Sequence, residues 1–168
     1  MTAPGYREVL RALFARQHAN AKDSNDGYET RGTGETPIRK ARRLFRKLET
    51  AIRKGLAASC HDCSEGGLAV ALAECCIGGN IGAEVELGSH AGKLMSEQVL
   101  FSESAGRFVL SVKKKNEKAF ARSMRGTPCA RIGQVFGQGV LSIKLHGQEL
   151  LSLPVSSLRD AWKKTMDW

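Results

Sequence analysis

The sequence predicts an α+β fold in which helices pack on one face of a single mixed β-sheet. Segments with the apolar spacing of helices alternate with short apolar runs that suit strands, and a hairpin and a last helix follow. Such an order is typical of helices layered on a sheet. With 168 residues, 42% hydrophobic and 6% aromatic, the chain can bury one aliphatic core.

The N-terminal third is predicted to hold two helices separated by a loop. Residues 5–17 carry apolar residues at helical spacing, whereas residues 18–36 are polar and glycine-rich, which is typical of loop or disordered chain. Residues 36–54 predict a strong helix, because Thr36 suits the N-cap and Pro37 the first helical position. We expect its apolar stripe to pack on the sheet; the stripe comprises Ile38, Ala41, Leu44, Phe45, Leu48 and Ile52.

The rest of the chain alternates between the two kinds of element and turns a hairpin at His146-Gly147. The predicted strands are 56–60, 82–87, 107–113, 130–136, 139–145 and 148–153. The predicted helices are 67–77, 92–99, 115–125 and 156–164.

Charge is distributed unevenly along the chain. The net charge of +9 divides into +7 for residues 1–60, −5 for residues 61–112 and +7 for residues 113–168. Basic ends can suit nucleic acid. No aromatic interleaving or nucleic-acid-binding motif accompanies the charge, so we interpret it as solvated helix faces and do not expect nucleic acid as a partner.

Hydropathy argues against a membrane protein. No apolar run approaches the ~20 residues of a membrane span, and the N-terminus has no apolar stretch of the kind found in signal peptides. We therefore predict a cytoplasmic protein. Its five cysteines fit this location, because an odd number is a poor framework for disulfides.

Cys60 and Cys63 have the C-x-x-C spacing of zinc ligands. A structural zinc site needs four ligands, usually from two such pairs. The remaining thiols lie on the following predicted helix or at Cys129, and they form no second pair. We interpret the cysteines as small buried side chains and predict no metal site.

The segment from Ser59 to Gly82, SCHDCSEGGLAVALAECCIGGNIG, predicts a strand, a polar turn and a helix opened by two glycines. Free N–H groups and the positive end of the dipole make such a helix start an anion site. In a functional interpretation, Ser64 and the N–H groups of Gly66 and Gly67 hold a phosphate while Asp62 helps to hold a cation. In the alternative, the turn only packs the helix on the sheet, with Asp62 and Ser64 as caps. His61 suits a hydrogen-bonded turn residue better than a catalytic base.

A second polar turn, FSESAGR, precedes the strand at 107–113. Glu103, Ser104 and Arg107 could bind a sugar or phosphate. Alternatively, Glu103 and Arg107 form an internal ion pair that fixes the turn.

Three separated blocks resemble one family in the same order. SCHDCSEGGLAVALAE, LFSESAGRFVLSV and the tail ARIGQVFGQGVLSIKLHGQELLSLPVSSLRDAWKKTMDW are similar to the C-terminal domain of aminoimidazole-ribonucleotide-synthetase-related enzymes. The greatest similarity is to the last domain of phosphoribosylformylglycinamidine synthases. The resemblance covers residues 36–168, so we divide the chain into a leader (1–35) and this domain. Cys63 departs from the family, where an aliphatic residue is more usual.

The resemblance implies the fold of the synthetase (PurM) C-terminal domain, a relative of ferredoxin-like folds. It implies an ATP-dependent ligase that makes formylglycinamidine ribonucleotide from formylglycinamide ribonucleotide and glutamine-derived ammonia. ATP and Mg²⁺ would be bound mainly by a partner domain or subunit, and a glutaminase would complete the complex. The chain alone would be inactive, with no catalytic residue of its own.

The resemblance also bears on the second turn. The full-length enzymes contain two related copies of this domain, and in the first copy a similar turn contacts substrate. This sequence resembles the second copy, which makes an auxiliary or structural nucleotide site as fitting for Glu103, Ser104 and Arg107 as a substrate site. Two alternatives are a superfamily relative with another ATP-dependent reaction and a non-catalytic phosphate-binding or scaffold module.

Overall fold

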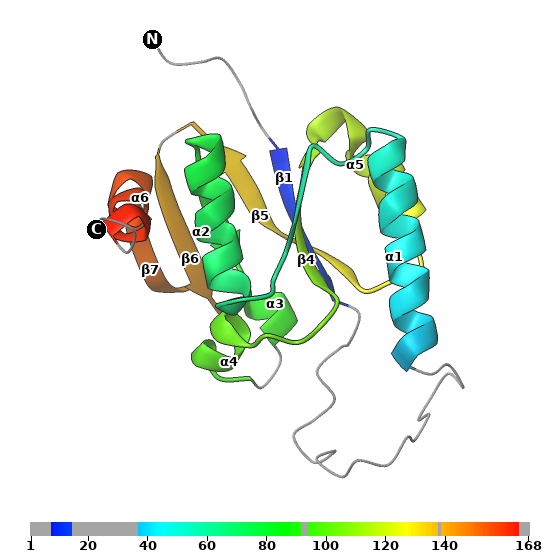
Figure 1. The fold of residues 1–168 in the computed structure, drawn as a ribbon, viewed down its shortest axis with the longest axis horizontal. Coiled ribbons are helices and arrows are strands. Elements are labelled where there is room, and N and C mark those ends of the chain that lie inside the picture. The colour runs from blue at the N-terminus through cyan, green and yellow to red at the C-terminus, as the bar shows by residue number, and fades with distance from the viewer. Residues whose placement is uncertain (1–7, 15–36, 92–93, 138, 165–168) are drawn as a thin grey trace.

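The computed structural model describes residues 8–14, 37–91, 94–137 and 139–164. Seven strands in these ranges form one sheet, with helices packed against it (Figure 1). In chain order the elements are β1 (Glu8–Phe14), α1 (Pro37–Arg53), β2 (Ser59–Asp62), α2 (Gly67–Gly79), β3 (Gly82–Glu86), α3 (Gly88–Ala91), α4 (Ser96–Phe101), β4 (Arg107–Lys113), the 3₁₀ turn η1 (Lys114–Asn116), α5 (Glu117–Ser123), β5 (Cys129–Phe136), β6 (Val140–Leu145), β7 (Gln148–Pro154) and α6 (Val155–Lys164).

The sheet order is β2-β4-β1-β5-β3-β6-β7. Strands β3 and β6 pair in parallel, and the other neighbouring pairs are antiparallel. The α+β class and the mixed sheet predicted from the sequence are therefore confirmed.

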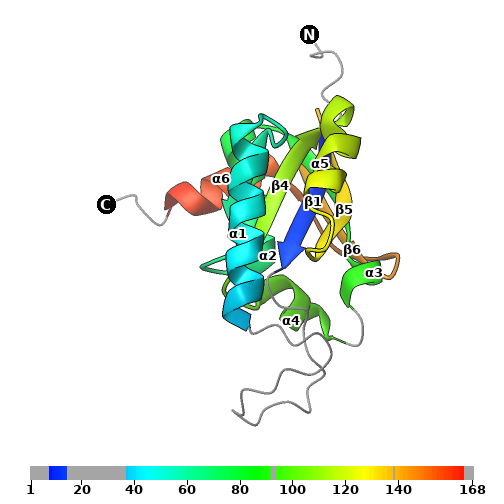
Figure 2. The same ribbon diagram turned by 90° about the vertical axis from the view of Figure 1, so that its right-hand side faces the viewer.

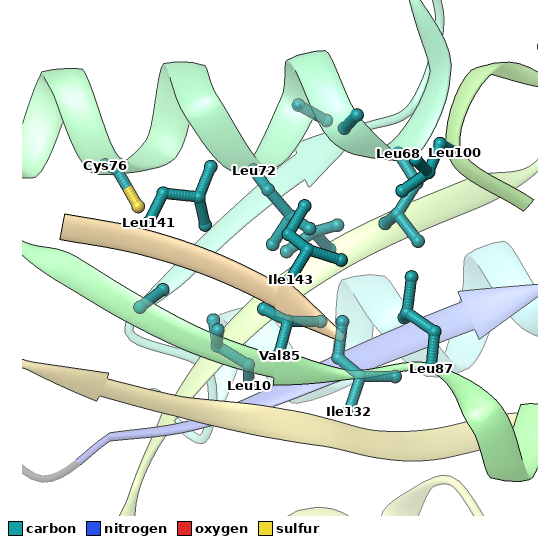
Figure 3. Close-up of a cluster of buried hydrophobic side chains, with 14 of the residues drawn as sticks. Leu10, Leu68, Leu72, Cys76, Val85, Leu87, Leu100, Ile132, Leu141 and Ile143 are labelled. Atoms are coloured by element: carbon teal, nitrogen blue, oxygen red, sulfur yellow. The ribbon is translucent and has the colours of Figure 1, made fainter. Parts of the chain in front are cut away.

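The larger core lies between α2 and the middle of the sheet. Leu68, Leu72 and Cys76 of α2 point toward the strands, where Leu141 and Ile143 of β6 meet them (Figure 3). Helices α4 and α6 extend this layer through further buried side chains, which are Val99, Leu100 and Val155. Hydrophobic burial of this kind supplies most of the favourable free energy of folding.

A second, smaller core lies on the opposite face of the sheet. Val109 of β4 belongs to the first core, whereas its neighbours Leu110 and Val112 belong to the second. Successive side chains of a strand point to opposite faces, so α1 and α5 must lie on the other side from α2. Figure 2 shows these two helices in front of β4 and β1. The prediction of helices on one face is wrong in this respect.

The helix predicted over residues 5–17 is also wrong, because residues 8–14 form the central strand β1. It pairs with β4 on one edge and β5 on the other. Val9 and Leu10 are adjacent and both buried, so the strand is covered on both faces. A strand buried on both faces lacks the period-2 pattern and cannot be told from a helix by periodicity. The rest of the predicted leader, its 18–36 loop and Thr36 lie outside the described residues. The proposed boundary at residue 36 stays a prediction, although β1 shares the sheet with the later strands.

The other predicted elements occur with small shifts. The strand predicted at 56–60 is β2, which includes His61 and Asp62 and so shortens the predicted turn. The hairpin turns at His146 (φ 52°) and Gly147 (φ 78°) as expected. Two central residues with positive φ match the right-handed twist of hairpin strands.

Helix α1 forms where expected, but only part of its apolar stripe faces the sheet. Leu44, Leu48 and Ala51 are buried against β4 and α5. The other three large members of the predicted stripe are exposed, with Ile38 at 71%, Phe45 at 48% and Ile52 at 48%. The predicted stripe is therefore wider than the contact with the sheet.

Leu48→Ala should lower the free energy of unfolding by about 2–5 kcal/mol, because it leaves a cavity in the second core. Arg42→Ala, on the exposed side of the same helix, should change it by less than about 0.5 kcal/mol. Urea unfolding of both variants checks this. Similar small effects would show that α1 presents a different face to the sheet.

Candidate functional site

The pairing of β2 with β4 brings the two predicted binding turns together. The strands are antiparallel, with Asp62 opposite Phe108. The end of β2 therefore lies beside the start of β4, and the turn after β2 lies beside the turn that leads into β4. Figure 1 shows α4 next to the end of α2 where these turns lie. We call the turns 63–66 and 102–106 the paired turns.

A carboxylate from the second turn caps the helix that follows the first. The backbone N–H of Gly66, the N-cap of α2, donates to Glu103 Oε1 at 2.8 Å. The positive end of the helix dipole favours a negative group at this position. No side chain caps α2 from its own N-cap residue. The anion position predicted from the sequence is thus held by a carboxylate of the protein itself.

Both glycines of the first turn are required by the backbone. Gly66 has φ +75°, and a Cβ there would lie 2.4 Å from Val70 Cγ2. Gly67 has φ +67°, and a Cβ would lie 2.8 Å from the carbonyl oxygen of Leu100. Positive φ and short contacts both exclude larger residues. Gly67 thus permits a close backbone approach between α2 and α4.

Arg107 holds the second turn from inside the protein. Its side chain is 3% exposed, and its guanidinium donates to Ser102 Oγ at 2.6 Å and to the Val99 carbonyl oxygen at 3.3 Å. Burial lowers the pKa of Arg107, and Cys63 acts in the opposite direction. Arg107 therefore fixes the path from α4 to β4.

The remaining predicted site residues lie around the hydrogen bond between Gly66 and Glu103, which we call the clasp. Asp62 and Ser64 are exposed, and Ser104 is half-buried in the second turn. The carboxylate of Glu103 accepts a hydrogen bond from the Gly66 N–H, and the guanidinium of Arg107 donates to Ser102 and Val99. The structure brings the two predicted groups of residues into one place. Whether they bind a ligand stays a prediction.

His61 is hydrogen-bonded within the protein. Its Nδ1 lies 2.6 Å from the carbonyl oxygen of Asp62, and its Nε2 lies 3.3 Å from Glu74 Oε2. These contacts hold the ring against α2.

The thiols of this region are protected from ionisation. Burial raises the pKa of Cys63, Cys75 and Cys76 to about 11. A thiol with this pKa is protonated at neutral pH and is a poor nucleophile. Among the described residues, no group of three or more His, Cys, Asp or Glu side chains is placed to hold a metal ion.

A polar hollow of about 460 Å³ lies elsewhere, on the part of the sheet formed by β5, β3 and β6. Its carboxylates are engaged internally. Glu84 pairs with Lys144 at 3.0 Å, and Glu86 accepts hydrogen bonds from the N–H groups of Gly88 and Gly147. These N–H groups lower the pKa of Glu86. Because the two predicted binding turns meet where β2 pairs with β4, we take the paired turns as the candidate site.

Comparison with known families matches residues 11–146 to the AIR synthase related protein, C-terminal domain. The chain belongs to this family. The match begins within β1 and ends at the hairpin turn, so it includes both paired turns.

Similar proteins include the phosphoribosylformylglycinamidine synthase subunit PurL of Thermobifida fusca, 42% identical over 125 residues. That of Methanococcus aeolicus is 37% identical over 121 residues. These alignments cover 73% and 71% of this chain but 15% and 16% of the relatives. The chain thus matches the C-terminal domain of PurL and spans less than a fifth of these relatives' length.

Solved structures show the same fold. T. maritima PurL complexed with ATP aligns with a TM-score of 0.70 at 18% identity, over 90% of this chain and 25% of that chain. The hydrogenase maturation protein HypE in complex with ATP aligns with a TM-score of 0.54 at 19% identity, over 65% of this chain and 39% of that chain. The predicted synthetase-like fold is confirmed.

The contact that sequence reasoning missed is the cap of α2 by Glu103. Its two partners are 37 residues apart, and neither segment carries a local signal for the other. An unpaired anion site in one turn and a carboxylate in the other were the only hints.

Glu103→Ala should lower the free energy of unfolding by about 0.5–2 kcal/mol, because α2 loses its cap. Glu103→Gln keeps an acceptor oxygen, so it should lower the free energy of unfolding only by the contribution of the charge–dipole interaction, about 0.3–1 kcal/mol. Urea unfolding measures both. The matched control is Glu65→Ala, which removes an exposed acid next to the same helix end. Equal losses in the two alanine variants would show that Glu103 acts only as a surface charge.

Proposed function

We propose that this chain serves as the C-terminal domain of a PurL-type phosphoribosylformylglycinamidine synthase. In this role it contributes to the ATP-dependent conversion of formylglycinamide ribonucleotide and ammonia into formylglycinamidine ribonucleotide. The observation that carries the proposal is the 37–42% identity to PurL subunits over more than two thirds of the chain. T. maritima PurL has been solved in complex with ATP and with FGAR.

The described residues suit a supporting part in that reaction. Activation of an amide oxygen by phosphoryl transfer needs Mg²⁺ carboxylates and cationic phosphate ligands gathered in one cleft. At the paired turns the carboxylate of Glu103 caps a helix and the guanidinium of Arg107 is buried in its own turn. We therefore assign ATP, Mg²⁺ and the catalytic groups mainly to a partner domain or subunit.

The partner in this proposal is an ATP-binding domain of the same enzyme or a separate subunit, with a glutaminase that supplies ammonia. A structure of PurLQS from Thermotoga maritima is among the structures that this fold matches. No helix in the described residues has the length and apolar character to cross a bilayer. A cytoplasmic location belongs to the same proposal.

We further propose that the first paired turn binds a phosphate when Glu103 moves away. Glu103 Oε1 marks where an anion is held by the Gly66 N–H, and Ser64 and Gly67 lie beside that position in the chain. A phosphate carries more charge and more acceptor oxygens than a carboxylate, so it can replace Glu103 at the helix end. Asp62 would help to hold an accompanying cation, and Glu103, Ser104 and Arg107 would shape an auxiliary nucleotide or substrate site. A non-catalytic phosphate-binding or scaffold module is the alternative role.

The purified chain alone should not consume ATP in the presence of formylglycinamide ribonucleotide and ammonia. A chimera in which residues 8–164 replace the corresponding segment of the Thermobifida fusca relative should retain synthase activity, because the two are 42% identical. A coupled assay for ADP measures both, with the segment deleted as control. Turnover by the isolated chain would contradict the proposal that the catalytic groups lie in a partner domain or subunit. A folded but inactive chimera would contradict the proposal that this chain is the C-terminal domain of a PurL-type synthase.

Inorganic phosphate at millimolar concentration should raise the melting temperature of the wild-type chain, because a ligand that binds only the folded state stabilises it. Glu103→Ala should enlarge this shift by removing the competing carboxylate, and Ser64→Ala should reduce it. Differential scanning fluorimetry at matched ionic strength in chloride gives the comparison. If neither the wild type nor Glu103→Ala responds to phosphate, the paired turns are only a structural clasp.

A further inference from the structure

One part of the apolar face of helix α1 is left exposed by the described residues. Ile38, Phe45 and Ile52 are spaced by seven residues, so they lie along one side of the helix with a drift of only ~20° per step. All three are exposed, at 71%, 48% and 48%. The ring of Phe45 also meets Phe108 of β4 edge to face, with centroids 5.7 Å apart. We call these three side chains the lateral stripe.

The lateral stripe faces sideways, along the sheet and away from α5. Phe45 directly follows the buried Leu44, so their side chains are about 100° apart around the helix axis. On the opposite flank, Lys47 Nζ contacts the carbonyl oxygen of Arg125, just after α5. The stripe therefore points past the edge strand β2, where the described part of the chain has no further layer.

The charge on this helix is predominantly positive. Between Pro37 and Arg53 the helix has seven Lys and Arg residues and one acid, Glu49. Glu49 pairs with Arg53 at 3.0 Å. Arg42 and Arg46 are exposed on the ridge that points away from the sheet. An occupant of the stripe would lie next to these cations.

We propose that the lateral stripe is the docking site of an acidic amphipathic helix of another protein domain or subunit. A helix lying beside α1 would pack apolar residues against Ile38, Phe45 and Ile52, in the manner of helix pairs with a seven-residue repeat. Glu or Asp residues that flank its apolar stripe would face Arg42 and Arg46. The matched relatives are more than six times longer than the aligned segment, so they contain other domains that can supply such a helix.

A membrane, a nucleic acid and a second copy of this chain could also bind a basic, partly apolar helix, but the geometry of α1 disfavours each of them. A flat bilayer would meet the charged ridge of Arg42 and Arg46 before it reached the stripe. Nucleic acid would contact the same ridge without using the apolar side chains. A second copy of this chain would bring two strongly basic helices together, and like charges at close range repel.

The test uses the full chain and a fluorescent 21-residue peptide with leucine at the a and d positions and glutamate at e and g. The control peptide has serine in place of every leucine and the same charge. We expect the leucine peptide to bind and the serine peptide to bind at least about ten-fold more weakly, because burial of apolar area drives the contact. Fluorescence anisotropy measures both.

Variants of the chain locate the contact. The double change Ile38→Ser with Ile52→Ser replaces two exposed apolar side chains, so the chain should still fold. Its affinity for the leucine peptide should fall by at least about ten-fold. Leu153→Ser, at an exposed apolar position on β7, is the matched control and should leave affinity unchanged. Arg42→Glu with Arg46→Glu should weaken binding most at low salt.

Several results would overturn the proposal. If the wild-type chain does not bind the leucine peptide, or binds both peptides equally, the lateral stripe is not a docking site for an apolar helix face. Sedimentation that shows dimers abolished by the double serine change would assign the stripe to a second copy. Stripe-dependent binding to phosphatidylserine vesicles or to single-stranded RNA, in place of the peptide, would assign it to those partners.

Discussion

The structure depends on β4 being buried on both faces and paired along both edges. Val109 faces the larger core, while Leu110 and Val112 face the smaller one. Strands β1 and β2 occupy its two edges. One strand thus joins both layers, so the two cores are coupled and neither is complete without the other. The same pairing decides where the paired turns lie, because the end of β2 must sit beside the start of β4.

The clasp between the paired turns is a modest electrostatic interaction between Glu103 and the N-terminal end of α2. A carboxylate at an exposed helix end contributes on the order of 1 kcal/mol. The buried parts of the same turn are held more firmly, by the guanidinium of Arg107 and by the close approach of Gly67 to Leu100. The exposed Glu103 can therefore leave while the backbone stays in place. Such a combination of a rigid backbone and a replaceable anion is what a phosphate site at this helix end would need.

Most elements could be predicted from the sequence, because they carry local signals. Helix α1 begins at a proline with the expected periodicity, and the hairpin turns at His146 and Gly147. β1 could not be predicted, because a strand covered on both faces has no alternation to read. For the site, the sequence predicted the residues of both turns, but it did not predict that the two turns lie next to each other. The contact of Gly66 with Glu103 depends on the pairing of β2 with β4, which neither segment encodes alone.

The misjudged face of α1 has the same physical cause. Periodicity shows which side of a helix is apolar but not how much of that side one neighbour covers. A contact with a single layer needs an apolar stripe roughly 100° wide. On α1 the apolar side chains run from Ala51 through Leu44 and Leu48 to Ile38, Phe45 and Ile52, and the sheet and α5 bury only the first part. A stripe wider than the contact with the sheet and α5 is expected where a further neighbour packs on the helix. The exposed side chains of α1 are therefore best explained by a further neighbour that the described residues do not supply.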